Sequence, residues 1–354
     1  MYTELSSTAQ TAYAQLFEAC QTGDYLRTVA NLPGSFASKT VKGRTYWYFQ
    51  YTEPAGKLRQ VYVGPDTPEV KALIAKKEVK PASQEAIGRL VRSATVLGCE
   101  PVPSKHFRVI ERLADYGFFR AGGVLIGTHA FISYGNLLGV RWGVPERTQD
   151  EDFAHAGRSL SIALPGNLKL DTDDPIKSLD MGLLPISGLV DKTGATYLNP
   201  QEPEFRLDFV TPLHREDGPY VHEGLGITLQ PLKFMEYSLE GVQQAVIFSG
   251  DRAVLVNVPD PARYALHKLL IYGERKGAFR AKLEKDLNQV ASLLLVLRER
   301  LPWSVEEAWQ DMDARGPGWR RRMTQGLEQL ERKFPQYEFG AWLKALSVPN
   351  SKPL

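Results

Sequence analysis

The chain has 354 residues, 43% of them hydrophobic and 24% charged, and its 43 Lys and Arg against 41 Asp and Glu give a net charge of +2. This composition is that of an ordinary globular protein, and it excludes collagen-like, mucin-like and wholly disordered classes. Because the total charge is nearly balanced, evidence for a polyanionic partner must come from local clusters of basic residues.

The cysteines and the apolar segments indicate the compartment. Cys20 and Cys99 are too few for a disulfide framework, and both lie on apolar faces of predicted helices, so we expect reduced thiols in the core. The first residues lack a basic and an apolar signal region, and the longest apolar stretch, about Val290–Leu297, is much shorter than the roughly 20 residues that span a bilayer. We therefore expect a soluble, cytoplasmic protein that makes no contact with a membrane.

The first third of the chain predicts helices around an aromatic β-hairpin or small meander. Helical spacing of apolar residues predicts helices over 8–30, 66–80 and 81–98. Between the first two, residues 35–64 are rich in aromatics and have turn glycines at Gly43 and Gly56.

An α/β region follows, and after it a wholly helical tail. The predicted elements of the α/β region are a helix over 104–116, strands over 124–126, 148–154, 159–164 and 204–210, a helix over 128–138, a loop-rich stretch over 165–200 and a hairpin over 244–258. The tail predicts helices over 261–275, 279–299, 304–314, 318–333 and 337–346. We expect an α+β protein with an N-terminal module over 1–102, a core over 103–258 and a C-terminal helical domain over 259–354.

A glycine turn stands between the first strand and helix of the α/β region. The segment from Gly122 to Thr128 reads as a short buried strand that ends in Gly127-Thr128 at the start of a helix. Backbone N–H groups at a helix N-terminus form an anion site, and a glycine lets a phosphate approach the chain closely. Taken alone, such a glycine more often marks simple turn chemistry.

Carboxylates on two later strands form a second pattern. Asp150 and Asp152 point to one side of a strand, because the side-chain period is two. Their repulsion is relieved when a hard cation such as Mg²⁺ lies between them, whereas a solvated strand edge is the plainer interpretation. Asp208, between apolar residues of another strand, needs a partner, which is either Arg206 on the same face or the same metal site.

Together these segments resemble the nucleotidyltransferase superfamily of the DNA polymerase β type. The resemblance is carried by Gly127-Thr-His-Ala-Phe131 and Thr148-Gln-Asp-Glu-Asp-Phe-Ala154, and it covers roughly residues 105–290. Within the superfamily they look most like an uncharacterised bacterial nucleotidyltransferase family, and more distantly like toxin nucleotidyltransferases of abortive-infection systems. The resemblance implies a polymerase-β-like core, a small mixed sheet with helices, and transfer of a nucleoside monophosphate from an NTP to a hydroxyl with release of pyrophosphate.

The resemblance also implies roles for individual residues. Asp150, Asp152 and Asp208 would be the catalytic aspartates and the ligands of Mg²⁺ or Mn²⁺, with Asp208 nearest the acceptor hydroxyl. Four residues would contact the nucleotide phosphates, namely Gly127 and Thr128 at the turn and Lys268 and Arg275 in the first tail helix. For Lys268 and Arg275 a solvated basic face is an equally good interpretation. His129 and His267 are expected to be packing or hydrogen-bonded residues.

The sequence departs from the family pattern at three places. Twenty-one residues separate Thr128 from Asp150, and the stretch from Gly139 to Arg147 is expected to be a loop over the site. Threonine stands at 128 where serine is commoner, and Glu151 stands where an apolar residue is usual, which implies that this strand face is not fully buried.

Basic residues gather in two further places. Residues 36–77 hold eight Lys and Arg against three acids, interleaved with aromatics, which is the combination that nucleic-acid surfaces use. The plainer interpretation is strand propensity and core packing. A second cluster, Arg315 with Arg320, Arg321 and Arg322, lies between predicted helices. If both clusters line one groove, the expected acceptor is RNA, such as a tRNA end.

Two alternatives remain open at this stage. In one, a degenerate core serves as a nucleic-acid-binding or interaction module; in the other, the enzyme acts on a protein or a small molecule. Convergence of the three aspartates distinguishes the first alternative from an enzyme, and the shape of the acceptor site distinguishes the second.

Overall fold

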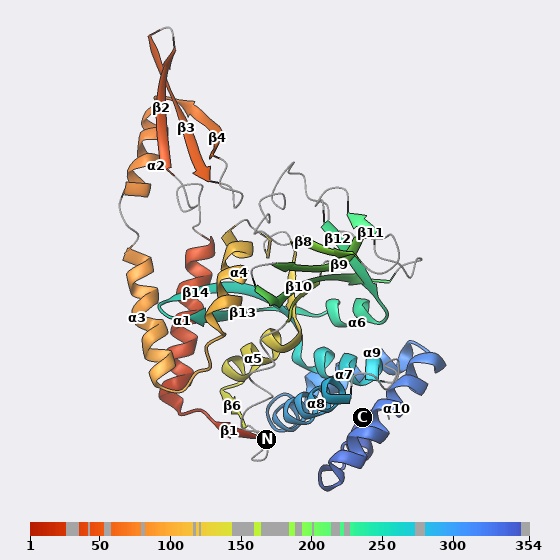
Figure 1. The fold of residues 1–354 in the computed structure, drawn as a ribbon. Coiled ribbons are helices and arrows are strands. Elements are labelled where there is room, and N and C mark those ends of the chain that lie inside the picture. Colours follow the sequence, from red (N-terminus) through yellow and green to blue (C-terminus); the bar gives the residue numbers. More distant parts are fainter. Residues whose placement is uncertain are drawn as a thin grey trace, which may run out of the picture.

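The computed structural model has helices and strands in the mixed order of an α+β protein (Figure 1). It describes residues 1–25, 35–41, 43–52, 58–78, 82–115, 118–119, 122–143, 159–163, 184–187, 193–199, 202–213, 220–222, 227–272 and 280–347. The helices are α1 (Ser7–Tyr25), α2 (Pro68–Glu78), α3 (Ala82–Val96), α4 (Ser104–Asp115), α5 (Gly127–Leu137), α6 (Met235–Leu239), α7 (Pro261–Tyr272), α8 (Arg280–Arg300), α9 (Pro302–Ala314), α10 (Pro317–Lys333) and α11 (Phe339–Ala345), with a 3₁₀ turn over Pro335–Tyr337.

The strands form one larger sheet, one three-stranded sheet and two separate strand pairs. They are β1 (Tyr2–Glu4), β2 (Ser35–Val41), β3 (Arg44–Thr52), β4 (Leu58–Pro65), β5 (Val124–Ile126), β6 (Val140–Trp142), β7 (Ser159–Ala163), β8 (Leu184–Ser187), β9 (Thr193–Asn199), β10 (Glu202–Pro212), β11 (Tyr220–His222), β12 (Ile227–Leu232), β13 (Val242–Ser249) and β14 (Arg252–Pro259).

The long strand β10 is the axis of the larger sheet. On one side it pairs in parallel with β7, and β7 pairs antiparallel with β5. Its other side pairs in parallel with β12 and antiparallel with β9, and these strands are extended by β11 and β8. The strands β8 and β9 lie in a stretch that the sequence predicts to be loop-rich, so this part of the prediction is wrong for 184–187 and 193–199.

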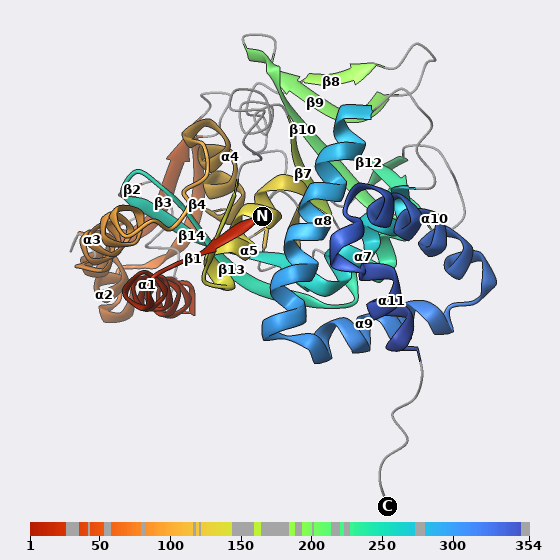
Figure 2. The ribbon, with the colours of Figure 1, turned by 90° about the horizontal axis from the view of Figure 1, so that it is seen from below.

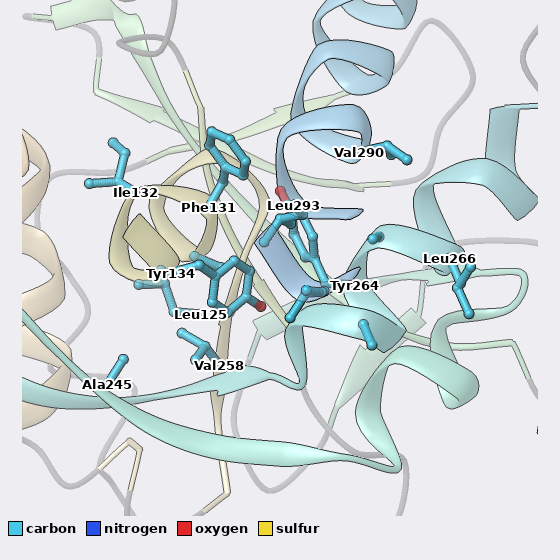
Figure 3. Close-up of a cluster of buried hydrophobic side chains, with 14 of the residues drawn as sticks. Leu125, Phe131, Ile132, Tyr134, Ala245, Val258, Tyr264, Leu266, Val290 and Leu293 are labelled. Atoms are coloured by element: carbon cyan, nitrogen blue, oxygen red, sulfur yellow. The ribbon is translucent and has the colours of Figure 1, made fainter. Parts of the chain in front are cut away.

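One large buried cluster joins the α/β region to the helical tail (Figure 3). It contains Leu125 and Tyr134 from β5 and α5, Val258 from β14, and Tyr264 and Leu293 from α7 and α8. Since the cluster runs across the domain boundary expected at 258/259, the tail helices share a core with the sheet region. The limits of the three expected domains stay a prediction.

The helices α1 and α3 pack on the opposite side of the β13–β14 hairpin from the tail helices (Figure 2). The hydroxyl of Tyr13 donates to the carbonyl oxygen of Val246 over 2.9 Å. Cys20 and Cys99 are buried in a second apolar cluster, with Tyr13 and Val246, so both lie in the core as expected. Cys99 lies after the end of α3 and not on a helix, and burial raises its pKa to about 11.

The stretch after α5 does not follow the sequence expectation. Residues 140–142, expected to be part of a loop over the site, form β6 and pair antiparallel with β1, so that Tyr2 lies opposite Trp142. Trp142 donates its indole N–H to the carbonyl oxygen of Phe131, which fixes β6 against α5. Among the described residues, no helix is long and apolar enough to cross a membrane.

Candidate functional site

The turn between β5 and α5 has the geometry that the sequence predicts. β5 ends at Ile126, and Gly127 opens α5 with a φ of +70°, a left-handed conformation that side chains disfavour. Thr128 follows as the second residue of the helix. The first N–H groups of a helix lack intrahelical partners, so this turn presents donors suited to an anion.

The strand register connects this turn to Asp208. Ile126 on β5 lies opposite Ser161 on β7, and Ser161 lies opposite Asp208 on β10. The three residues therefore form one row across the sheet, with Asp208 two strands from the residue that precedes Gly127. At about 4.8 Å between neighbouring strands, the row spans roughly 10 Å.

A tyrosine of the helical tail holds the β5–α5 turn by a hydrogen bond. Tyr264 on α7 is 3% exposed, and its hydroxyl donates to the carbonyl oxygen of Gly127 over 2.9 Å. The same hydroxyl lies 3.3 Å from Oε1 of Gln289, a buried residue of α8. This contact holds the first residue of α5 to two helices of the tail.

Lys268 lies one helical turn beyond Tyr264 and is largely buried. Its ammonium forms an ion pair with Asp286 on α8 and lies 5.1 Å from the centroid of the Tyr264 ring. The side chains of Lys268 and Asp286 are 11% and 8% exposed. The described contacts of Lys268 are therefore within the protein, and its predicted contact with nucleotide phosphates stays a prediction.

Two buried histidines lie against each other at the start of α5 and on α4. His129, the third residue of α5, lies with its Nε2 2.9 Å from Nδ1 of His106 on α4, which agrees with its expected role as a hydrogen-bonded residue. Burial lowers the pKa of His129 to about 3, and electrostatic interactions with His106 and Lys285 lower it further. At neutral pH the ring of His129 is therefore uncharged.

Three of the expected site residues, Asp150, Asp152 and Arg275, lie outside the described residues. Asp208 is described by its backbone and register. Within the described part of the chain, no group of three or more His, Cys, Asp or Glu gathers in a way that could hold a metal ion.

The sequence did not predict the residues that contact the turn and Lys268, namely Tyr264, Gln289 and Asp286. Asp286 and Gln289 are three apart on α8, and Tyr264 and Lys268 are four apart on α7, so each pair shares a helix face. Polar residues at this spacing on helices with apolar faces were the sequence feature that could have predicted these contacts. In the second basic cluster, Arg315 forms ion pairs with Glu240 and Asp311, whereas Arg320 and Arg321 are exposed.

Comparison with known families identifies the class of protein. A family model described as a nucleotidyltransferase matches residues 104–314, which is more than half of the chain, and the protein belongs to this family. It is therefore a transferase by family, one whose fold is of the α+β kind. A second model, a domain of unknown function (DUF6788), matches residues 10–72. Neither a curated protein nor a solved structure matches the chain.

Proposed function

We propose that the protein is a metal-dependent nucleotidyltransferase of the polymerase β type. It moves a nucleoside monophosphate from an NTP to an acceptor hydroxyl and releases pyrophosphate. The observation that carries the proposal is the row Ile126–Ser161–Asp208, which brings an aspartate-bearing strand to within two strands of the Gly127 turn. The family match over residues 104–314 supports the class of reaction.

Three aspartates would hold the divalent ions. The donor set fits Mg²⁺ or Mn²⁺, because carboxylate oxygens are the hard ligands that such ions prefer. Bound there, the ions supply charge neutralisation of the triphosphate and alignment of the attacking and leaving oxygens. Asp150 and Asp152 are assigned as ligands, and Asp208 as the ligand nearest the acceptor, where its carboxylate orients the acceptor hydroxyl or takes its proton.

The protein's part in binding the nucleotide is positioning. The N–H groups at Gly127 and Thr128 receive phosphate oxygens, and the bond from Tyr264 keeps the turn in place. Lys268 and Arg275 are assigned to the same phosphates. For Lys268 this requires that a phosphate share or replace its ion pair with Asp286.

The acceptor is assigned as an RNA hydroxyl, such as that at a tRNA end. This assignment rests on the basic and aromatic residues of 36–77. Because the sequence resembles toxins of abortive-infection systems, we also propose that modification of host RNA by this protein slows bacterial growth. Induced expression in a bacterium, with Asp150→Ala/Asp152→Ala as the control, tests this, and equal growth of both strains would contradict a toxic activity.

The transfer itself is tested with labelled nucleotides. The protein is incubated with each α-labelled NTP and Mg²⁺, once with total RNA and once with a protein extract. We expect label in RNA with one preferred NTP, loss of label on chelation with EDTA, and no label with Asp150→Ala/Asp152→Ala. Labelling that persists in the double variant rules out the proposed site.

Asp208 is tested separately with a conservative change. Asp208→Asn keeps the size of the side chain and removes the charge, so we expect a loss of at least about 100-fold in the transfer rate. Asp313→Asn, at a partly exposed ion pair with Arg320, is the matched control and should leave the rate unchanged. Label in the protein extract alone would make the acceptor a protein, and no label in either extract would favour a degenerate core.

A further inference from the structure

The strands β2, β3 and β4 form a small antiparallel sheet that Figure 1 shows beyond the ends of α1 and α3. Its register defines two faces. Trp47 and Phe49 alternate with Tyr46 and Tyr48 along β3, so the two pairs belong to opposite faces. The two faces differ in what covers them.

The face of Trp47 and Phe49 is covered by α2. Phe49 is 2% exposed and packs edge-on against Phe36 with ring centroids 5.3 Å apart. The indole of Trp47 donates to Asp66 over 2.9 Å, and Asp66 also pairs with Lys71 on α2 over 3.0 Å. This face is the core of the small sheet.

The opposite face presents aromatic rings to solvent. Tyr62 on β4 lies opposite Tyr48 in the register and is 55% exposed. Its ring centroid lies 5.6 Å from that of Tyr48, edge-on, and 6.3 Å from that of Tyr46, tilted. The three rings form one contiguous aromatic platform, in which Tyr62 is exposed and Tyr46 and Tyr48 are half-buried. Exposed aromatics that are grouped in this way mark a binding surface more often than scattered ones do.

Cations frame the platform. Lys39 lies opposite Tyr46 in the register, and its ammonium is 4.9 Å from the centroid of the Tyr48 ring. Arg44, two residues before Tyr46, belongs to the same face and is exposed. The described positions of this face carry no acid, and residues 36–77 as a whole hold eight basic residues against three acidic ones.

We propose that this open face binds single-stranded RNA. Rings that reach solvent can stack on bases that are not already stacked in a duplex, which favours a single strand, while Lys39 and Arg44 attract its phosphates. The choice of RNA rests on the proposed function, in which an RNA hydroxyl is the acceptor. The sheet would thus hold the acceptor strand while the core supplies the nucleotide.

The test measures binding by fluorescence anisotropy with the full-length protein. The probes are a labelled 12-nucleotide RNA of mixed sequence, the DNA of the same sequence, and the RNA as a duplex. We expect the single-stranded RNA to bind most tightly. Tighter binding of the duplex, equal binding of the DNA, or binding of none of the probes would overturn the proposal.

Variants assign the binding to the face. Tyr48→Ala/Tyr62→Ala should raise the Kd for RNA at least about tenfold, because stacking of each base on a ring contributes at that scale. Tyr48→Phe/Tyr62→Phe keeps both rings and should bind as the wild type does. Trp303→Ala removes an aromatic that is 63% exposed on α9 and serves as the matched control. Equal Kd values for the alanine pair and the wild type contradict the assignment.

The charge is tested by salt. Lys39→Gln should lower the slope of log Kd against log salt concentration by about 0.7, the value for one phosphate contact to a single strand. Lys344→Gln, at an exposed position on α11, should leave the slope unchanged. A slope that Lys39→Gln does not alter would exclude Lys39 from the interface.

The two proposals fail separately. Asp150→Ala/Asp152→Ala should abolish nucleotide transfer and keep the Kd for RNA, if the binding face and the core act as described. If the wild type transfers no nucleotide but the alanine pair still weakens RNA binding, the proposed function fails and the RNA face stands. If transfer to RNA is intact in the alanine pair at limiting RNA, the face is not the acceptor site.

Discussion

The hydroxyl of Tyr264 and the carbonyl oxygen of Gly127 are 2.9 Å apart, although 137 residues separate them in the sequence. This hydrogen bond joins the helical tail to the turn at which the proposed nucleotide site begins. Tyr264 also packs edge-on against Tyr134, with ring centroids 5.2 Å apart, which holds its ring in position (Figure 3). The tail is therefore part of the support of the site.

Tyr264→Phe should weaken the turn and keep the packing. Loss of the bond leaves the partly buried Gly127 oxygen without this donor, so we expect the free energy of unfolding to fall by about 1–2 kcal/mol. The KM for the NTP should rise as well, because the turn is less well held. Both are measured, by urea denaturation and by initial rates.

The matched control is Tyr134→Phe, which removes a buried bond of 2.8 Å to the carbonyl oxygen of Pro259. It should lower stability by a similar amount and leave the KM unchanged. An equal rise in KM for both variants would show that Tyr264 acts only through general stability.

The ion pair of Lys268 and Asp286 gives a second prediction. Lys268→Met leaves the carboxylate of Asp286 buried without this partner, and loss of one member of a buried pair costs about 3–5 kcal/mol. Lys268→Met/Asp286→Leu should recover much of that loss. Urea denaturation measures both effects.

The exposed pair of Arg89 and Glu85, whose side chains are 62% and 80% exposed, is the control. Arg89→Met should cost less than about 1 kcal/mol, because solvent screens such pairs. If Lys268→Met costs no more than Arg89→Met, the ammonium is not held by Asp286 in solution, and it is then available to phosphate as the sequence predicts.

Local patterns in the sequence predicted much of the fold. The strand over 124–126 and the hairpin over 244–258 are confirmed by β5 and by β13–β14, because alternation and turn residues are encoded within a few positions. The helices of the tail are confirmed within a few residues, since their apolar stripes are long and regular.

Pairings between distant segments could not be predicted in this way. The parallel pairing of β10 with β7 and the antiparallel pairing of β1 with β6 depend on register between segments far apart in the chain. The same holds for the site: the sequence pointed to Gly127 and Lys268, but their partners Tyr264 and Asp286 follow from how α7 and α8 pack. Residue spacing alone carries no information on that packing.

The acid stability of the protein should depend on His129. Its pKa is about 3 in the folded protein and about 6.5 when unfolded, so the unfolded state binds a proton first as the pH falls. The contribution of His129 to the free energy of unfolding is complete above pH 6.5 and is lost as the pH falls toward 3. Between pH 7 and pH 5 the loss amounts to ~2 kcal/mol.

The measurement is the free energy of unfolding at pH 7 and pH 5 for the wild type and for His129→Asn. The variant has no group that titrates there, so its loss between the two pH values should be smaller than that of the wild type by ~2 kcal/mol. Equal losses would mean that His129 is protonated equally in the folded and unfolded states, which its burial beside His106 opposes.

Gly326 lies where α10 packs against α7. Of the described glycines in the tail, it leaves the least room for an added Cβ. A Cβ there would lie 2.4 Å from the carbonyl oxygen of Leu269, a backbone atom that cannot rotate away. Gly326→Ala should therefore push α10 from α7 and lower stability by about 1–3 kcal/mol. Gly318 lies on the same helix, and a Cβ added there would meet nothing within 4 Å, so Gly318→Ala should be neutral or stabilise by up to about 1 kcal/mol. Thermal unfolding of the two variants compares them directly, and a Gly326→Ala protein as stable as Gly318→Ala would contradict the close packing of α7 and α10.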